Sequence, residues 1–489
     1  MGRFMMKKKI IALCAVAAAV LLAATVLWQR HTATMKAEQE AQYRENHIFV
    51  EDAVYPKDAK QLDLRGTGIS IQHYESIRSQ LPECHILWDV PFQGVTYPSN
   101  TESLTLTTLS DEDVNRLDYL TQLKTVDAMN CTDYPQLMKL QARHSGCSIS
   151  YQLSLGDEIY SNSTTALTFS DADPAELLEK LQYLTQLQTV HFIQPAFEAN
   201  HLLKLRETYP NVAFTWEKDV LGTTYRDDVT ELDFSGIQME SVEQIEADMA
   251  YFPSLEKLVM IDCGIDGETM AAFRERARGS YKVVWAIHIQ SLTIRTDIEA
   301  FAPIKYGIYV TDIHMGEFHY LEDLVCLDLG HKGIKNIDFI WKMPRLKYLI
   351  LADTEVSDIT PIGSLKELEY LELFKTKVTD YSPLLGCTAL EDVNLACTKG
   401  DASVFAQMPW LKNLWINQCG VDQQTRELLI KSLPDTQIEF DHTWHLGNSW
   451  RGLPNYFKIR DILGMPYYDW GNEVGRPGDP GYPYEVENP

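Results

Sequence analysis

The sequence predicts an α/β protein in which short strands stack along the chain as a solenoid, behind a single N-terminal membrane helix. Two observations predict this architecture. A leucine pattern recurs at a fixed spacing in the C-terminal third of the chain, and an uncharged apolar run follows a basic N-terminus. The 489 residues are enough for a long repeat array, and their 45% hydrophobic content is typical of a folded protein.

The N-terminus predicts where the chain lies. Residues 1–9 are basic, with Arg3 and three consecutive lysines, and residues 10–28 carry no charge. A helix of that length, at ~1.5 Å per residue, nearly crosses a hydrocarbon core of ~30 Å. We therefore expect a cytoplasmic tail at 1–9, a transmembrane signal anchor at 10–28, and a single-pass protein of the cell membrane with its C-terminal domain extracellular. A cleaved signal peptide is the alternative, although His31 to Ala33 is a poor cleavage site, and it would export the same residues.

The residues that follow the anchor predict a spacer. Residues 29–57 are polar and rich in helix-forming side chains. We expect them to form a stalk that lifts the next domain from the membrane.

The C-terminal third carries the most regular pattern. An LxxLxL motif begins at five leucines that are spaced by 22, 22, 22 and 21 residues: Leu324, Leu346, Leu368, Leu390 and Leu411. Each motif predicts a short strand whose leucines face the solenoid interior, and neighbouring turns must stack because one turn cannot bury its apolar side alone. We expect regular repeats over residues 321–440.

The segments between these strands carry a family resemblance. Residues 356–362 and 378–384 have the V-x-D-x-x-P-[IL] pattern that returns the chain along the convex side. The sequence resembles the bacterial internalin-type leucine-rich-repeat proteins, and more broadly the membrane-anchored, exported leucine-rich-repeat proteins of Firmicutes. The resemblance implies a horseshoe-shaped solenoid that binds partners. This chain departs from the family where the family has Asn after the strand, because it has Thr354, Thr376, Thr398 and Cys419; we therefore expect less regular curvature.

A longer repeat precedes the regular one. Residues 117–126 recur at 181–190 and, more loosely, at 249–258, and a second motif around Trp88 recurs around Tyr151 and Trp216. Each unit of about 65 residues reads as strand, helix, strand, helix, strand, with helices expected at 111–120 and 174–184. We interpret residues 58–320 as enlarged, helix-bearing leucine-rich repeats, by a looser resemblance to long repeat units of exported proteins.

The pattern stops after Phe440. Residues 441–470 contain Trp444, Trp450 and Tyr456, and we expect them to form a C-terminal cap over the open end of the last repeat. Residues 471–489 consist largely of Gly, Pro and acidic residues, which predicts a disordered tail.

Charge and cysteine content exclude some function classes. The net charge of −26, with no Lys/Arg cluster outside the first nine residues, argues against nucleic acid as a partner. The nine cysteines form no CxxC pair, and several fall at positions expected in the core. This favours free, buried thiols, while disulfides in an exported domain stay open.

No motif indicates catalysis. The sequence contains no phosphate-binding glycine loop, no HExxH and no GxSxG. Asp441, His442 and His445 are the best local candidates for metal ligands, although a cap loop is the simpler interpretation. We therefore expect no catalytic residue, metal or cofactor. A metal-dependent or glycan-cleaving enzyme is the weakest alternative.

The regular strands predict a candidate binding face. Residues between the core leucines should project from the concave side in three columns, and we expect exposed aromatic side chains there because such side chains are enriched at binding sites. Asp328 and Glu372 would supply polar selectivity. The alternative is that some aromatics, Trp415 above all, pack under the cap. The candidate ligand-binding residues are Tyr348, Ile350, Tyr370, Glu372, Phe374, Asn394 and Trp415.

These observations predict a cell-surface recognition or adhesion protein, which binds a protein or glycan partner through the solenoid face and the membrane through its N-terminal helix. An envelope scaffold that binds a membrane protein of the same cell is the first alternative, and an enzyme is the second.

Overall fold

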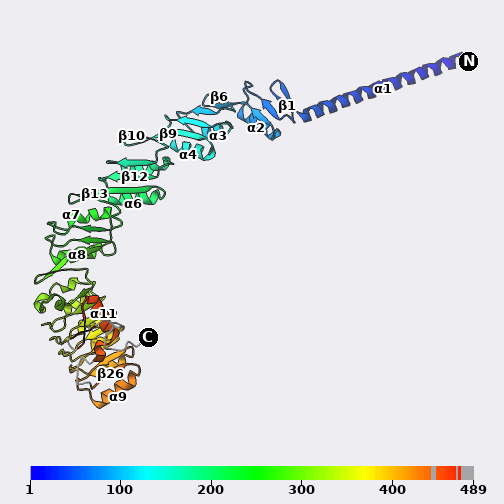
Figure 1. Ribbon diagram of the computed structural model, residues 1–489. Coiled ribbons are helices and arrows are strands. Elements are labelled where there is room, and N and C mark those ends of the chain that lie inside the picture. Colours follow the sequence, from blue (N-terminus) through cyan, green and yellow to red (C-terminus); the bar gives the residue numbers. More distant parts are fainter. Residues whose placement is uncertain (1, 442–447, 470–471, 475–489) are drawn as a thin grey trace. The chain divides into compact units, whose positions relative to one another are not determined.

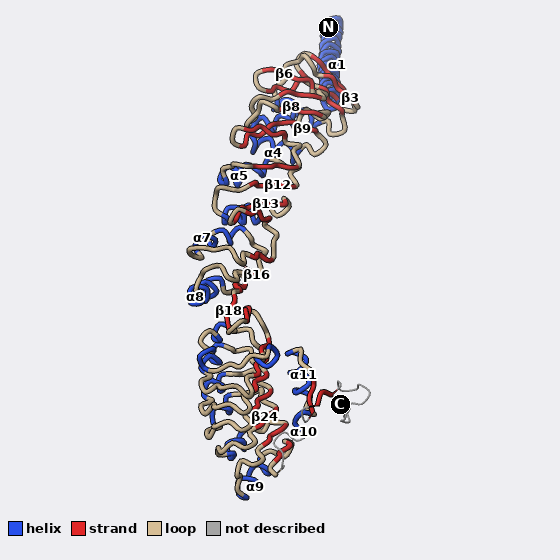
Figure 2. Tube along the Cα trace, turned by 60° about the vertical axis from the view of Figure 1, so that its left-hand side comes forward, coloured by secondary structure: helices blue, strands red, loops and turns tan. Residues whose placement is uncertain are grey.

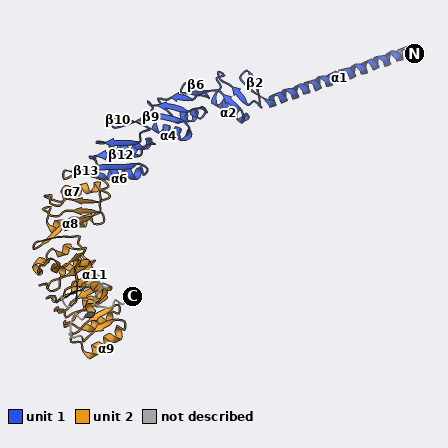
Figure 3. Ribbon diagram, viewed as in Figure 1, with its two compact units in different colours: residues 1–216 blue, residues 217–489 orange. Residues whose placement is uncertain are grey.

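The computed structural model describes residues 2–441, 448–469 and 472–474. The chain divides into two compact units, Met1–Trp216 and Glu217–Pro489 (Figure 3), and each is described by itself.

The first unit begins with one long helix, α1 (Gly2–Asn46), drawn in dark blue in Figure 1. The side chains of residues 6–7 and 9–46 are exposed, and by length and composition the helix could cross a membrane between Lys9 and Asn46. The expected anchor and the first part of the expected stalk are therefore one helix. The stalk prediction is wrong from His47 on: residues 47–56 form the hairpin β1 (His47–Val50) and β2 (Ala53–Pro56), and Ile48 and Val50 are buried in the core.

The rest of the first unit alternates short strands with helices. Its elements are β3 (Gln61–Asp63), α2 (Ile71–Gln80), β4 (His85–Leu87), β5 (Asp89–Phe92), β6 (Val95–Pro98), β7 (Ser103–Thr105), α3 (Asp111–Leu117), β8 (Thr125–Ala128), α4 (Tyr134–Arg143), β9 (Ser148–Leu155), β10 (Glu158–Ser161), β11 (Ala166–Phe169), α5 (Pro174–Lys180), β12 (Thr189–Ile193), α6 (Ala199–Thr208) and the first half of β13 (Ala213–Val220), which continues into the second unit. Local signals explain the helix starts. Ser110 and Asp113 form a capping box on α3, and the Asp173 carboxylate caps α5 ahead of Pro174.

Within each sheet of this part of the chain, neighbouring strands follow one another in chain order. In the sheet β10-β9-β8-β7 the strands β7, β8 and β9 are parallel, and β10 returns antiparallel to the second half of β9. The third strand therefore continues into a hairpin, which the sequence analysis did not foresee. β5 and β6 form the corresponding hairpin one repeat earlier in the chain.

A buried aromatic residue lies at the start of four of the hairpins. These residues are Trp88, Tyr151, Trp216 and Trp285, and the first three are the residues around which the second sequence motif recurs. In three of these hairpins a polar side chain near the end accepts a hydrogen bond from the backbone N–H of the aromatic residue. Ser99 Oγ accepts from Trp88, Asn162 Oδ1 from Tyr151 and Thr296 Oγ1 from Trp285, each at 3.1 Å.

The second unit opens with a similar strand-and-helix segment. Its elements are β14 (Thr223–Arg226), β15 (Glu231–Asp233), α7 (Glu243–Glu246), β16 (Lys257–Val259), α8 (Gly267–Ala277), β17 (Lys282–Val284), β18 (Ala286–Ile289) and β19 (Leu292–Arg295). Strands β15, β16 and β17 are parallel neighbours.

A seven-stranded parallel sheet then runs in strict chain order. Its strands are β20 (Ala300–Phe301), β21 (Cys326–Asp328), β22 (Tyr348–Ile350), β23 (Tyr370–Glu372), β24 (Asp392–Asn394), β25 (Asn413–Trp415) and β26 (Gln437–Glu439). Leu327, Leu349, Leu371, Val393 and Leu414 are register partners from strand to strand and are fully buried. The predicted stacking is confirmed, and the sheet begins one strand before residue 321.

Short 3-10 turns return the chain on the other side of this stack. They are η6 (Asp338–Lys342), η7 (Thr360–Ser364), η8 (Ser382–Gly386) and η9 (Ala402–Gln407), and helix α9 (Gln423–Ser432) follows them. At the turn after each of β21 to β25, a residue other than glycine adopts a positive φ, as at Asp353 and Lys375. After β22, β23 and β24 the next residue is a buried threonine whose hydroxyl donates to the carbonyl three residues back, as from Thr354 to Leu351 at 2.7 Å and from Thr376 to Leu373 at 2.8 Å.

The described part of the C-terminal segment, residues 448–469 and 472–474, does not close the end of the stack as predicted. Its elements α10 (Asn448–Arg451) and α11 (Pro454–Leu463) lie along the strands of the sheet, with α11 packed on β20 and β21 (Figure 2). The strands β27 (Tyr467–Asp469) and β28 (Asn472–Val474) follow as an antiparallel pair. Residues 472–474 are therefore ordered in a strand within the tail that was expected to be disordered, and the rest of that tail lies outside the described residues.

Candidate functional site

The outward-facing residues of the regular strands form the columns that the sequence predicts. One column is Cys326, Tyr348, Tyr370, Asp392 and Asn413, and the next is Asp328, Ile350, Glu372, Asn394 and Trp415, each residue a register partner of the one before. Each repeat contributes one short strand, and the strands pair in parallel. Their leucines point inward and the residues between them form the outward columns, and this arrangement decides the fold. This stack is a leucine-rich-repeat solenoid.

The columns are covered. All seven candidate residues are buried, from fully buried Tyr370, Asn394 and Trp415 to Ile350 at 9% exposure. The expectation of an exposed aromatic platform on this solenoid is therefore wrong. The physical reason is that the face is too apolar to stay in water, and residues 448–467 of the same chain fold onto it.

Trp450 is the central contact of this cover. Its ring lies 5.0 Å from the Tyr370 ring and 5.1 Å from the Trp415 ring, centroid to centroid. Its indole Nε1 donates a 3.1 Å hydrogen bond to Glu372 Oε1. Three of the seven candidate residues therefore bind one tryptophan of the C-terminal segment.

Asp392 forms a second polar contact with the cover. Asn455 Nδ2 of α11 donates to Asp392 Oδ2 at 2.9 Å, and Asn413 Nδ2 of the next strand donates to Oδ1 at 2.7 Å. Burial raises the pKa of Asp392 in spite of these two donors. The amide of Asn455 thus fixes the register of α11 on the solenoid.

A cavity of about 600 Å³ lies between the solenoid and this cover. Its solenoid side includes Asp328, Ile350, Glu372 and Phe374, and its cover side includes Trp450, Arg451, Tyr456 and Arg460. The sequence predicts Ile350, Glu372 and Phe374 as ligand residues and Asp328 as a source of selectivity. It does not predict the residues on the cover side, because nothing in the sequence says which face the C-terminal segment meets.

The two carboxyl groups of the cavity are perturbed. Burial, and then the negative charge of Asp328, raise the pKa of Glu372 to about 7. Burial also raises the pKa of Asp328, although the backbone N–H of Gly330 donates to its Oδ1 at 2.9 Å. Arg451 opposes the rise at Glu372 and Arg460 opposes the rise at Asp328. The cavity therefore holds carboxyl groups on one side and guanidinium groups on the other.

Backbone contacts hold the cover side in place. Arg460 Nε donates to the Pro466 carbonyl at 2.8 Å, and Lys305 Nζ, which also lines the cavity, donates to the Leu463 carbonyl at 2.7 Å. The second contact ties the C-terminal end of α11 to the first turn of the solenoid.

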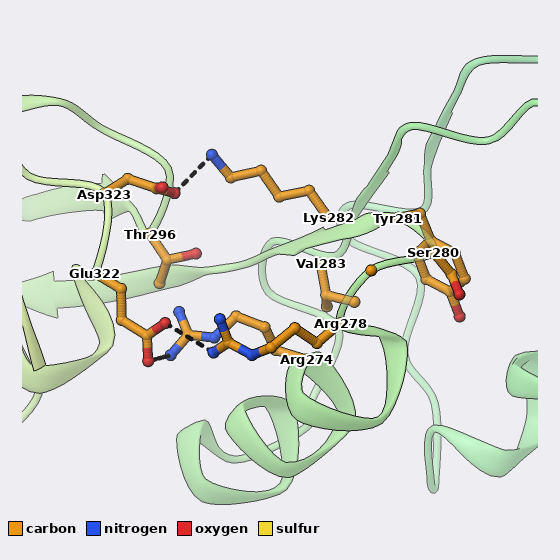
Figure 4. A pocket seen from close by; sticks show the side chains of 10 residues that line it. Arg274, Arg278, Ser280, Tyr281, Lys282, Val283, Thr296, Glu322 and Asp323 are labelled. Carbon is orange, nitrogen blue, oxygen red and sulfur yellow. Dashed lines mark hydrogen bonds and ion pairs between the residues drawn. The ribbon is translucent and has the colours of Figure 1, made fainter. Parts of the chain in front are cut away.

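A second cavity, of about 360 Å³, is lined by charged side chains that form ion pairs with one another (Figure 4). Glu322 lies between Arg274 at 2.7 Å and Arg278 at 3.1 Å, and Lys282 Nζ lies 2.6 Å from Asp323. These pairs join α8 and β17 to the loop before β21. We interpret this cavity as part of the contact between neighbouring repeats, which these ion pairs hold together.

A third hollow, of about 410 Å³, lies on the open strand face of β7, β8 and β9. Every second residue of these strands points into the core, and the alternate residues are exposed and mostly carry hydroxyl groups. The exposed polar residues that line the hollow are Ser103, Thr105, Thr125, Asp127, Ser148 and Ser150.

The structure bears on the predictions about cysteine and metal. All nine cysteines are free thiols, and seven of them are buried, as the favoured interpretation required. Among residues 2–441, 448–469 and 472–474, no group of three or more His, Cys, Asp or Glu side chains could hold a metal ion. His442 and His445 lie outside the described residues. Asp441 forms an ion pair with Arg426.

Comparisons with known proteins leave the family open. No protein-family model and no curated protein match the chain. Similar solved structures include an internalin C2 of Listeria monocytogenes (17% identity, TM-score 0.22, 47% of this chain and 83% of that chain) and a second internalin of that organism (13%, 0.23, 77% and 92%). A leucine-rich-repeat protein of Leptospira interrogans is another (14%, 0.27, 68% and 93%). The fold is assigned from the strand register of the solenoid.

Proposed function

We propose that the protein is a membrane-anchored recognition protein that binds a protein or glycan partner outside the cell. The N-terminal helix supports the anchoring, because it is long, apolar and exposed, and its positive charges precede the apolar run. The repeat architecture supports binding, because stacked repeats present extended faces of outward side chains. In this proposal the strand-and-helix units within 58–320 are enlarged leucine-rich repeats that extend the binding surface.

The open face of β7, β8 and β9 is the observation that carries the proposal. Its exposed hydroxyl groups donate and accept hydrogen bonds, and Asp127 adds a charged acceptor. Such a face matches the hydroxyl groups of a glycan or the polar groups of an extended peptide. The aromatic columns of the regular solenoid are covered, so we assign them to holding the C-terminal segment and place the first contact with a large partner on the open polar face.

Partner capture by two matched double variants tests this proposal. Thr125→Arg with Ser148→Arg places two long cations on neighbouring strands of the face, and Thr121→Arg with Gln122→Arg places the same charges in the exposed turn before β8. We expect the first variant to lose capture on a glycan array, from host extracts or from membranes of the producing cell. The second should keep it. Equal capture by both would contradict the proposal, and capture from the cell's own membranes alone would identify the protein as an envelope scaffold.

A further inference from the structure

We propose that the cavity between the regular solenoid and α11 binds a small zwitterion, a free amino acid or a dipeptide. This site is separate from the polar face assigned above to a large partner, and it uses residues of both the solenoid and the C-terminal segment. The inference rests on three features of the cavity: its carboxyl side, its guanidinium side and its size.

The carboxyl side fits an ammonium group. Asp328 and Glu372 stand in one column with Ile350 between them, and strands in a sheet are spaced by about 4.8 Å. The backbone N–H of Gly330 donates to Asp328 at 2.9 Å. Glu372 accepts from the Trp450 indole at 3.1 Å and from the Tyr370 hydroxyl at 3.5 Å. A carboxylate accepts about four hydrogen bonds, so both retain acceptor capacity for a primary ammonium group in the cavity.

The guanidinium side fits a carboxylate group. Arg451 and Arg460 reach the cavity from α10 and α11, and Arg460 is only 8% exposed. Guanidinium groups bind carboxylates through paired, charge-assisted hydrogen bonds. Lys305 adds a third cation to the lining.

The balance of charge selects a ligand that carries both signs. A simple amine would meet Arg451 and Arg460, and a simple acid would meet Asp328 and Glu372, so each would gain one contact and suffer one repulsion. A zwitterion satisfies both sides. Ile350, Phe374 and Tyr456 offer apolar contact to its side chain, and a volume of about 600 Å³ is in the range of small-molecule sites.

Binding of free amino acids to the full chain tests the proposal. Each of the twenty L-amino acids, and glycyl-leucine as a dipeptide, is titrated calorimetrically into the detergent-solubilised protein. We expect at least one to bind, and its N-acetyl derivative, which lacks the ammonium, and its amide, which lacks the carboxylate, to bind at least about ten-fold more weakly, which corresponds to ~1.4 kcal/mol. Binding of both derivatives as tightly as the parent would overturn the proposal, as would no binding by any of the twenty-one compounds.

Isosteric variants assign the site. Asp328→Asn and Glu372→Gln keep an oxygen for the Gly330 and Trp450 donors but remove the negative charge. We expect each to weaken binding at least about ten-fold. Glu391→Gln is the matched control and should bind normally, because Glu391 lies directly before β24, pairs with Lys412 and does not line the cavity. Binding that is unchanged in Asp328→Asn and Glu372→Gln would place the ligand elsewhere and refute the assignment.

Discussion

At the residue scale, a few side chains decide that the C-terminal segment covers the solenoid. The Trp450 indole packs between Tyr370 and Trp415 and donates to Glu372. Glu372 lies between Ile350 and Asn394 in its column and is buried, so it needs hydrogen-bond donors or a proton. Burial of the aromatic rings and satisfaction of one carboxyl therefore depend on the same residue.

Trp450→Ala should release the cover. Truncation of a buried aromatic residue costs about 3 kcal/mol or more, and here it also removes the donor to Glu372. We expect faster hydrogen–deuterium exchange in α11 and around Trp415. Trp341→Ala, at an indole that is 52% exposed, should leave both regions unchanged. Unchanged exchange in Trp450→Ala would show that the indole does not hold the segment.

The raised pKa of Glu372 makes the stability of this region depend on pH. The folded-state pKa of about 7 lies above the ordinary value of 4.5, so the folded state holds its proton more tightly than the unfolded state. The resulting stability is fully present below pH 4.5 and is lost as the pH rises through about 7. Between pH 5 and pH 8 we expect a loss on the order of 2 kcal/mol from this group.

Urea unfolding at pH 5 and pH 8 measures this dependence. Glu372→Gln cannot ionise, so its stability should fall less over this range than that of the parent chain. The same pH slope in both proteins would show that Glu372 is not buried as described.

At the element scale, the spacing of residues in the sequence was sufficient to predict a strand wherever the environment of a side chain is set by its own repeat. The leucine positions predicted strands β21 to β25 and their register, because inward residues recur with each turn. The recurring motif around Trp88 located the buried aromatic residues but not the hairpins that they begin. A three-residue strand followed by a hairpin has too few residues to show a distinct hydrophobic period, so the sequence did not predict the hairpins.

Leu371→Ala tests the stacking of the regular strands. Its side chain is fully buried between Leu349 and Val393, and leucine-to-alanine substitution in a core costs about 3 kcal/mol. We expect a lower urea midpoint by tryptophan fluorescence. Leu428→Ala, at a leucine of α9 that is 42% exposed, should change stability by less than about 1 kcal/mol. Equal effects of the two substitutions would contradict the inward orientation of Leu371.

At the scale of the whole molecule, sequence reasoning placed the candidate residues correctly on one face and misjudged their surroundings. Tyr370, Glu372 and Trp415 do lie in adjacent columns. Their exposure depended on residues 448–467, which meet them from far along the chain. Hydrophobic periodicity reports contacts within a repeat, and a non-repeating segment that docks on the array leaves no periodic signal. The segment's own aromatic residues, Trp450 and Tyr456, were the available hint.

The C-terminal segment covers this face of the solenoid, and the reactivity of two native thiols reports directly on that cover. Cys326 is fully buried in the cluster that includes Ile459 and Leu463 of α11, whereas Cys387 is buried at the end of η8, where its Sγ donates to the Ile362 carbonyl. In thiol labelling followed by mass spectrometry, we predict slow labelling of both cysteines in the full chain. In a chain that ends at Asp441, Cys326 should label fast and Cys387 should stay slow. Equally slow labelling of Cys326 in both chains would contradict the account.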